Sequence, residues 1–341
     1  MRSINTVLGL MSPDELGITM MHEHICLHQE DFRGLSLYYA ITGLKRARRL
    51  GVRTLCECTP VDILPDEKAG KADLIHRIPS RSIMSDLQTI SKESGLNILC
   101  SVGYYGPDAA PGGLGYAPGL KDADAETLAE RMVKAITEGI SDTGVRAGFI
   151  KVGSHHVPLT SMEKRVFKAA ALAQSRTGVA ICTHAVTGCG AQQKILMENG
   201  ADPDHCYYSH IEAEMGWEGR SPEEEAEYLI DVASKGGGLF FNNFYLDPHT
   251  PWEDMTYLMR RLIDAGYLSK VLIGIDHNWR VHPDGVLEFE HERENPDCRK
   301  RNYTFLFEHE VPRLLEAGFK EKEIHAMLLE NPRSILAPYK P

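Results

Sequence analysis

Short apolar runs alternate with longer segments of helical spacing along almost the whole chain. The runs are rich in Val, Ile, Phe and Tyr, as is typical of buried strands. They predict eight strands, at residues 17–24, 53–58, 97–105, 147–153, 179–185, 206–212, 238–244 and 271–277. Apolar positions three and four apart predict helices at residues 35–50, 81–94, 124–138, 161–176, 192–199, 221–235, 251–265, 303–317 and 320–329.

This order of elements predicts an α/β fold, a single (β/α)8 TIM barrel that spans residues 1–341 as one domain. Nearly continuous apolar strands are typical of a parallel sheet covered by helices. An open doubly wound sheet is the alternative; it would normally carry a Gly-rich phosphate loop after an early strand, and the sequence has none. Barrel enzymes build their sites at the C-terminal ends of the strands, where the longest irregular stretches follow (residues 59–80, 106–120 and 277–302).

Two of the predicted helices begin with recognisable start signals. The stretch Ser221-Pro-Glu-Glu-Glu supplies a cap, a proline for the first turn and acids behind it. The stretch SMEK at Ser161 is interpreted as a capping box. We therefore expect both helices to begin close to these serines.

Composition and charge narrow the class of protein. The net charge of −11 disfavours a nucleic-acid partner, because such a chain is not built to follow a phosphate backbone. The N-terminus lacks a signal-peptide core, and no run approaches the length of a membrane span. Five of the eight cysteines lie in the predicted apolar strands, where free thiols behave as small hydrophobes. We expect a reduced, cytoplasmic protein that contacts neither nucleic acid nor membrane.

Six groups that can bind a metal or carry charge lie near the ends of predicted strands: His22, His24, Lys151, His184, His210 and Asp276. A lone histidine at a strand end is more often a polar core residue than a ligand. Six such groups on five strands of one barrel would, however, converge on a single mouth. Their coincidence predicts a metal site at the C-terminal ends of the strands.

Lys151 and Asp276 strengthen this prediction. Burying either charge costs several kcal/mol unless the group is paired, neutralised or modified. His277 follows Asp276 directly, so its side chain should point to the opposite side of the strand. It is as plausible that His277 holds a metal ligand in place as that it contacts a metal itself.

The order of the motifs HEH, FIKVG, THA, SHIE and GID resembles the phosphotriesterase family of the amidohydrolase superfamily. The opening VLGLMSPDELGITMMHEHI resembles the first signature of that family, and AGFIKVGSHHVPLTSMEKRVFKAAALAQSRTGVAICTHA resembles the second. LENPRSIL resembles its usual C-terminal helix. The similarity runs from Asn5 to Pro338, nearly the whole chain.

The resemblance implies a set of ligands for two divalent metal ions. His22, His24 and Asp276 would bind the more buried ion, and His184 and His210 the more exposed one. Lys151 would carry a carbamate derived from carbon dioxide, whose oxygens bridge the two ions. Zn2+ suits imidazole and carboxylate, and Mn2+, Co2+ or Fe2+ would also fit.

The resemblance also implies a hydrolase, in which a hydroxide bridging the metals attacks a lactone or related carboxylic ester. Asp276 and Lys151 would be catalytic, with Asp276 taking up the proton. Alternatives on the same site are a phosphotriester (organophosphate) hydrolase and an amide hydrolase. A non-hydrolytic decarboxylase or isomerase and a catalytically dead binding protein are further alternatives. The resemblance favours a homodimer.

Candidate substrate contacts follow from the same comparison and from the polar loop after the eighth strand. Tyr105 matches a tyrosine that lies near the metals in lactonases of the family, with Tyr104 as the alternate. Asn243 stands where lactonases for acyl-homoserine lactones carry an arginine, which argues against a long-acyl substrate. Arg280 could pair with an anionic group and Trp279 could line the mouth, so we expect a polar or anionic lactone. The basic run 299–301 is interpreted as a solvated face.

Overall fold

The computed structural model describes residues 3–25, 33–61, 80–104, 123–155, 157–185, 188–244, 250–282, 284–289, 291–293 and 295–339. Tyr105 and Cys26 lie outside these residues. Within the described part of the chain, no helix combines the length and apolar character needed to cross a bilayer.

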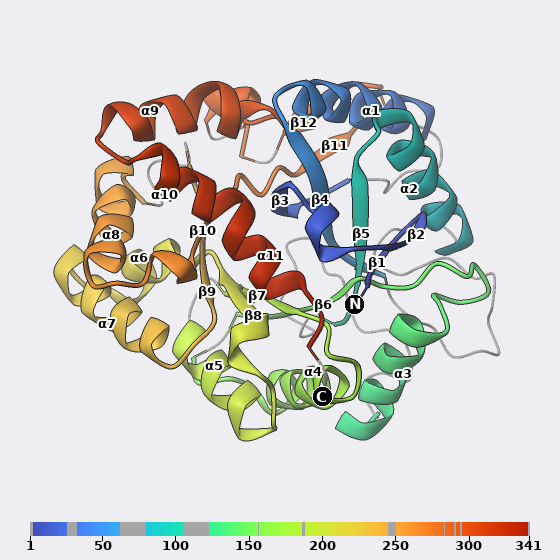
Figure 1. Cartoon of the computed structure of the whole chain (residues 1–341), viewed down its shortest axis with the longest axis horizontal. Helices are drawn as coiled ribbons and strands as arrows, with labels where there is room; N and C mark the ends of the chain where they lie inside the picture. The colour runs from blue at the N-terminus through green and yellow to red at the C-terminus, as the bar shows by residue number, and fades with distance from the viewer. Residues whose placement is uncertain are drawn as a thin grey trace.

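Eight parallel strands form the centre of the molecule, and helices surround them (Figure 1). They pair in sequence order, from β3 to β10. Their bounds are β3 Ile18–Glu23, β4 Val52–Val61, β5 Asn97–Val102, β6 Phe149–Ser154, β7 Ile181–Ala185, β8 Cys206–Ser209, β9 Gly238–Phe241 and β10 Val271–Ile273. All eight predicted strands are confirmed, and so is the TIM-barrel prediction.

The barrel closes between β3 and β10 just beyond the ends of these strands. The backbone N–H of His24 donates to the carbonyl of His277 at 3.1 Å. The backbone N–H of His277 donates to Oε2 of Glu23 at 2.6 Å. Two hydrogen bonds thus join the first and last strands at the C-terminal mouth, one between backbone groups and one from a backbone N–H to a carboxylate.

Most of the surrounding helices match predicted ones, with ends shifted by a few residues. Their bounds are α1 Arg33–Arg49, α2 Ser80–Ser94, α3 Ala125–Thr137, α4 Ser161–Thr177, α5 Cys189–Glu198, α6 Glu214–Glu218, α7 Pro222–Ser234, α8 Trp252–Asp264, α9 Val311–Glu316, α10 Glu321–His325 and α11 Asn331–Leu336. The short helix α6 lies inside a stretch for which the sequence predicts no helix.

Two π-helical turns interrupt the last predicted helices. Leu306–Glu310 precedes α9 and Ala326–Glu330 precedes α11. Each turn lies just ahead of a proline, Pro312 or Pro332, near the start of the following helix. A proline has no N–H to donate to the residue four positions earlier, and a widened turn accommodates that loss.

Both helices with predicted start signals begin with a capping box, but in one of them the capping residue is a neighbour of the predicted one. Ser221 caps α7 through a capping box with Glu224, as predicted. The cap of α4 is Thr160 rather than Ser161, because Glu163 stands three residues after Thr160 and completes the reciprocal pair. The box pattern requires that spacing, which Ser161 does not have.

Two small hairpins are absent from the sequence prediction. β1 (Ile4–Thr6) pairs with β2 (Gly9–Met11), and β11 (Trp279–Val281) pairs with β12 (Leu287–Phe289). Strands of three residues are too short to show an alternating pattern. The second hairpin lies within residues 277–302, for which we predicted no regular secondary structure.

The hydrophobic core has an inner and an outer part. The inner part fills the barrel, and Leu16, Ile335 and Leu336 belong to it. Helix α11 crosses one end of the barrel (Figure 1). The outer part lies between strands and helices and contains Cys100 and Cys206. All seven cysteines of the described residues are buried and free.

Candidate metal centre

The six predicted groups come from strand ends on the open side of the barrel. His22 lies in β3, Lys151 in β6 and His184 in β7. His24, His210 and Asp276 follow β3, β8 and β10 within a few residues. Parallel strands end at the same edge, so these side chains meet at one mouth.

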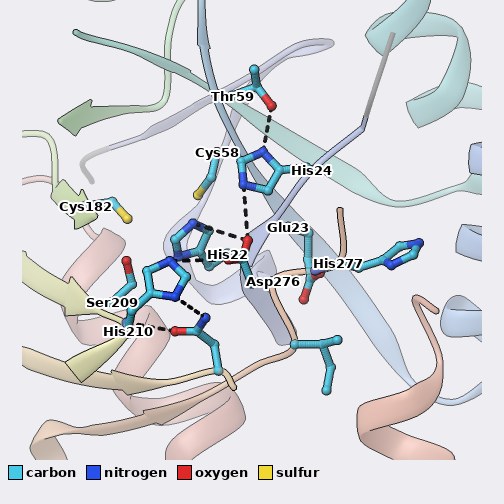
Figure 2. A network of polar contacts seen from close by, with 12 residues as sticks. His22, Glu23, His24, Cys58, Thr59, Cys182, Ser209, His210, Asp276 and His277 are labelled. Carbon is cyan, nitrogen blue, oxygen red and sulfur yellow. Dashed lines mark hydrogen bonds and ion pairs between the residues drawn. The ribbon is translucent and has the colours of Figure 1, made fainter. Parts of the chain in front are cut away.

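Asp276 lies at the centre of the cluster. Its Oδ1 is 3.1 Å from Nε2 of His24 and 3.6 Å from Nε2 of His22. Its Oδ2 is 3.3 Å from Nε2 of His210 (Figure 2). One carboxylate from β10 therefore faces three imidazoles from β3 and β8.

Lys151 and His184 complete the cluster. Nζ of Lys151 is 3.0 Å from Nε2 of His22. The rings of His184 and His210 lie edge to face with centroids 4.4 Å apart, and the His155 ring stacks on His184 at 5.0 Å. The structure brings all six predicted residues together, and adds His155 beside them.

Burial and mutual charge keep most of these imidazoles neutral. Burial lowers the pKa of His22 and His184 well below the usual value, with a further contribution from Lys151 for His22 and from His210 for His184. Burial also lowers the pKa of His210 to about 4. A neutral imidazole offers a nitrogen lone pair, which is the form that binds a metal ion.

Asp276 and His24 form the charged pair of the cluster. Burial opposes ionisation of Asp276, but its electrostatic interactions with the rings of His22 and His210 and its hydrogen bond with His24 outweigh burial and hold its pKa well below the usual range. Burial likewise opposes the charged form of His24, but the hydrogen bond to Asp276 prevails and raises its pKa. An ionised carboxylate among imidazoles is a suitable ligand set for Zn2+.

Several residues that support the cluster were not predicted. Oγ1 of Thr59 is 2.7 Å from Nδ1 of His24. The side chain of Asn242 contacts His210 twice: its Oδ1 accepts from the backbone N–H at 2.9 Å, and its Nδ2 is 2.8 Å from Nδ1. Both residues lie next to strand ends that carry no predicted ligand, so sequence spacing gave little reason to select them.

Two buried carboxylates hold the strand ends beneath the cluster. Oε1 of Glu212 accepts from the backbone N–H groups of Asn242 and Asn243, at 2.7 and 2.5 Å. Glu23 accepts from the N–H of His277. Burial raises the pKa of Glu212 to about 7 and that of Glu23 to about 8. Glu23 alternates with His22 and His24 along the chain, which was the available signal that it faces away from the site.

His277 supports the closure of the barrel and points away from the cluster. Figure 2 shows its ring turned away from Asp276, as the alternation predicts. Nε2 of His277 lies 2.9 Å from the hydroxyl of Tyr39, and the ring packs against Phe289 and Tyr303. Burial and the charge of Arg301 lower its pKa to about 3.

The predicted substrate contacts lie in different surroundings. Asn243 is buried beside Asn242 at the end of β9, close to His210. Tyr104 is buried in the outer core. The Trp279 indole is buried there too; it packs on Tyr39 and donates to the Tyr303 hydroxyl at 3.0 Å.

Arg280 is exposed on β11 and pairs with Glu288 of β12. The structure therefore places Asn243 near the cluster, whereas Trp279 pairs with Tyr303 and Arg280 with Glu288. Tyr105 lies outside the described residues.

Arg301 corrects the interpretation of the basic run. Arg299 is exposed, but Arg301 is buried. Its Nη2 donates to the carbonyls of Asn242 and Ile275, one residue beyond β9 and one residue before Asp276. The prediction of a solvated face is wrong for this residue, because its guanidinium satisfies two strand-end carbonyls inside the protein.

The residues fit a divalent metal ion. One nitrogen each of His22 and His24 and one oxygen of Asp276 all lie within 4.8 Å of one another. Nε2 of His210 is buried and makes no hydrogen bond to the described residues. Imidazole nitrogens and a carboxylate that converge in this way form the donor set that zinc and related ions prefer.

Fold and site together define a (β/α)8 barrel with a candidate metal centre at the C-terminal ends of its strands. The sequence profile of the phosphotriesterase family matches residues 2–336. The chain belongs to this family, which confirms the resemblance found in the sequence.

Individual relatives match over nearly their whole length. The chain is 27% identical over 354 residues to the phosphotriesterase homology protein of Mycobacterium tuberculosis, covering 98% of each chain. It is 26% identical over 336 residues to an aryldialkylphosphatase of Saccharolobus solfataricus, covering 95% of this chain and 96% of the relative.

A solved structure shows the same fold. The crystal structure of the phosphotriesterase homology protein from Escherichia coli, complexed with phosphate in its active site, matches with a TM-score of 0.73 and 21% identity. The match covers 95% of this chain and 99% of that one.

Proposed function

We propose that the protein is a metal-dependent hydrolase whose cluster binds two divalent cations, with zinc as the preferred ion. The convergence of three imidazoles on one carboxylate carries this proposal: Nε2 of His22, of His24 and of His210 each lie 3.1–3.6 Å from an oxygen of Asp276. Membership of the phosphotriesterase family supports a hydrolase.

The ligands divide by position in the barrel. His22, His24 and Asp276 would hold one cation, and His184 and His210 the other. Lys151 would hold both once its amine carries a carbamate. Its burial supports this role, because a fully buried lysine amid imidazoles gains by becoming an anionic ligand.

Two divalent cations would supply a water nucleophile at neutral pH and polarise the carbonyl or phosphoryl oxygen of the substrate. Asp276 is held as a carboxylate and can accept the proton of the attacking water. It can then pass that proton to the leaving group or to solvent. Thr59 and Asn242 keep the rings of His24 and His210 in place.

We propose a polar or anionic lactone, or a related carboxylic ester, as the substrate. Asn243, an amide buried beside the cluster, supports a polar group on the substrate, whereas Arg280 pairs with Glu288 and gives no such support. A phosphotriester is the second candidate, because one relative is an aryldialkylphosphatase. Tyr105 and Asn243 remain candidate substrate contacts.

A substrate panel on metal-reconstituted protein tests the proposal. Lactones, carboxylic esters, amides and phosphotriesters are offered in turn, and released acid is followed with a pH indicator. We expect turnover that chelation removes and that a divalent cation restores. Lys151→Ala should lower it at least about 100-fold, since a bridging ligand is lost.

Lys168→Ala is the matched control, because Lys168 is an exposed lysine of α4. It should keep full activity. Turnover that persists in the stripped enzyme would overturn the metal-dependent mechanism. A Lys151→Ala variant that remains active without an added carboxylic acid would overturn the bridging role.

A further inference from the structure

Two thiols lie beside His22 in the interior of the barrel. Cys58 belongs to β4 and Cys182 to β7, and both are fully buried, as is His22. The two sulfur atoms and one ring nitrogen of His22 all lie within 4.8 Å of one another. Figure 2 shows both sulfur atoms on the side of the cluster where His22 lies.

Strand geometry explains why these thiols face the cluster. Cys182 is two residues before His184 on β7, so both side chains point into the barrel. Cys58 belongs to the inner core, as does Cys182. Cys100 and Cys206, also on strands, belong to the outer core and point toward the helices.

A cationic group already sits in this thiol cluster. Nζ of Lys151 donates to Sγ of Cys182 at 3.2 Å and lies 3.0 Å from Nε2 of His22. Cys58 Sγ is turned toward the carbonyl of Met21, at 3.7 Å. The amine of Lys151 therefore lies against one soft donor, Sγ of Cys182, and against the ring nitrogen of His22.

We propose that His22, Cys58 and Cys182 form a second site for a thiophilic divalent cation such as Zn2+, Co2+ or Cd2+, and that this site shares His22 with the proposed catalytic centre. Zinc binds sulfur at about 2.3 Å and imidazole nitrogen at about 2.0 Å, so two sulfurs on one tetrahedral ion lie about 3.8 Å apart. The donors need to approach one another by about 1 Å at most from their 4.8 Å limit.

The site differs in chemistry from the proposed catalytic centre. Thiolates select soft and borderline ions, whereas Mn2+ prefers oxygen ligands. His22 belongs to both groups of donors. A thiophilic ion held by the cysteines therefore takes an imidazole that the group of His24 and Asp276 would otherwise use.

Cobalt spectroscopy tests the site without any substrate. The full-length protein is stripped of metal, kept reduced and titrated with Co2+, and sulfur-to-cobalt charge transfer is recorded in the near ultraviolet. We expect this band in the wild-type protein and its loss in Cys58→Ser and in Cys182→Ser. Cys100→Ser is the matched control, since this thiol is equally buried on a neighbouring strand but faces outward.

X-ray absorption on the zinc-loaded wild-type protein gives the same answer without any variant. We expect sulfur at about 2.3 Å from part of the zinc. A zinc spectrum with nitrogen and oxygen neighbours alone, or a cobalt band that survives in both cysteine variants, would overturn the proposal. Neither result depends on turnover, so both are separate from the test of hydrolysis.

Discussion

Asp276 and His210 combine chemistry with an unusual backbone conformation. Both lie in the left-handed region, with φ of 54° and 61°. This region costs an L-residue about 1–2 kcal/mol. Two long-range hydrogen bonds offset the cost: the Asn242 side chain accepts from the N–H of His210, and the Glu23 side chain accepts from the N–H of His277, which follows Asp276. The strained positions thus carry two of the predicted metal ligands.

We predict that the Asp276→Asn variant folds but loses most of its catalytic activity. Asparagine tolerates the left-handed region as well as aspartate does, so the metal-free variant should still fold and unfold cooperatively, at an unfolding temperature lowered by loss of the ion pair with His24. The carboxylate is lost both as ligand and as proton acceptor, so kcat should fall about 100- to 10,000-fold. Thermal unfolding and steady-state kinetics measure the two effects.

Asp264→Asn, an exposed aspartate at the end of α8, serves as the control and should leave both quantities unchanged. An Asp276→Asn variant that retains wild-type kcat would show that the carboxylate takes no part in turnover.

At the scale of elements, a side chain from outside the sheet links the C-terminal ends of β9 and β10. Arg301 follows a short 3-10 helix, Pro296–Lys300, and its guanidinium donates to one carbonyl just beyond β9 and one just beyond β10. One of these carbonyls, that of Ile275, directly precedes Asp276. A single side chain therefore fixes the strand end that carries the central carboxylate.

We predict that Arg301→Met destabilises the protein by about 2–4 kcal/mol, because two buried carbonyls lose a charged donor. The free energy of unfolding in urea, measured on metal-free protein, checks this value. Arg299→Met is the control from the same run, since Arg299 is exposed and pairs with Glu292 at 3.4 Å. It should change stability by no more than about 0.5 kcal/mol. Equal effects of the two substitutions would contradict the assigned role of Arg301.

At the scale of the whole molecule, buried carboxylates make stability depend on pH. Glu214 is buried, accepts from the N–H of Cys189 at 2.7 Å and lies 3.5 Å from Arg220. Burial raises its pKa from 4.5 to about 7 despite that cation. A raised carboxyl pKa means that the folded state keeps a proton that the unfolded state has released. The stabilisation is complete below pH 4.5 and is lost as the pH rises through 7.

We predict that Glu214→Gln removes this part of the pH dependence. Wild-type stability should fall by about 3 kcal/mol more than that of the variant between pH 4.5 and pH 8. Urea unfolding at several pH values measures the difference. Glu198→Gln, on the exposed face of α5, should follow the wild-type curve. Parallel curves for Glu214→Gln and wild type would show that Glu214 ionises alike in both states.

The eight strands and most helix positions could be predicted because burial of an apolar face repeats with the period of each element. The candidate ligands could be predicted for a related reason. His22, Lys151, His184 and Asp276 are polar residues that interrupt apolar strands, and the barrel brings strand ends to one mouth. The hairpin β11–β12 and helix α6 could not, since neither is long enough to show a period.

By itself, the sequence determined the alternation of strand and helix, the barrel, and which strand ends carry six polar groups, since these follow from the local order of apolar and polar residues. Only the tertiary structure decided which residues support the site. Glu23 meets the N–H of a residue 254 positions away, and Asn242 meets His210 across 32. The burial of Arg301 and the proximity of Cys58 to Cys182 likewise arise only when distant strands close into a barrel. The spacing of residues along the chain does not reveal such contacts.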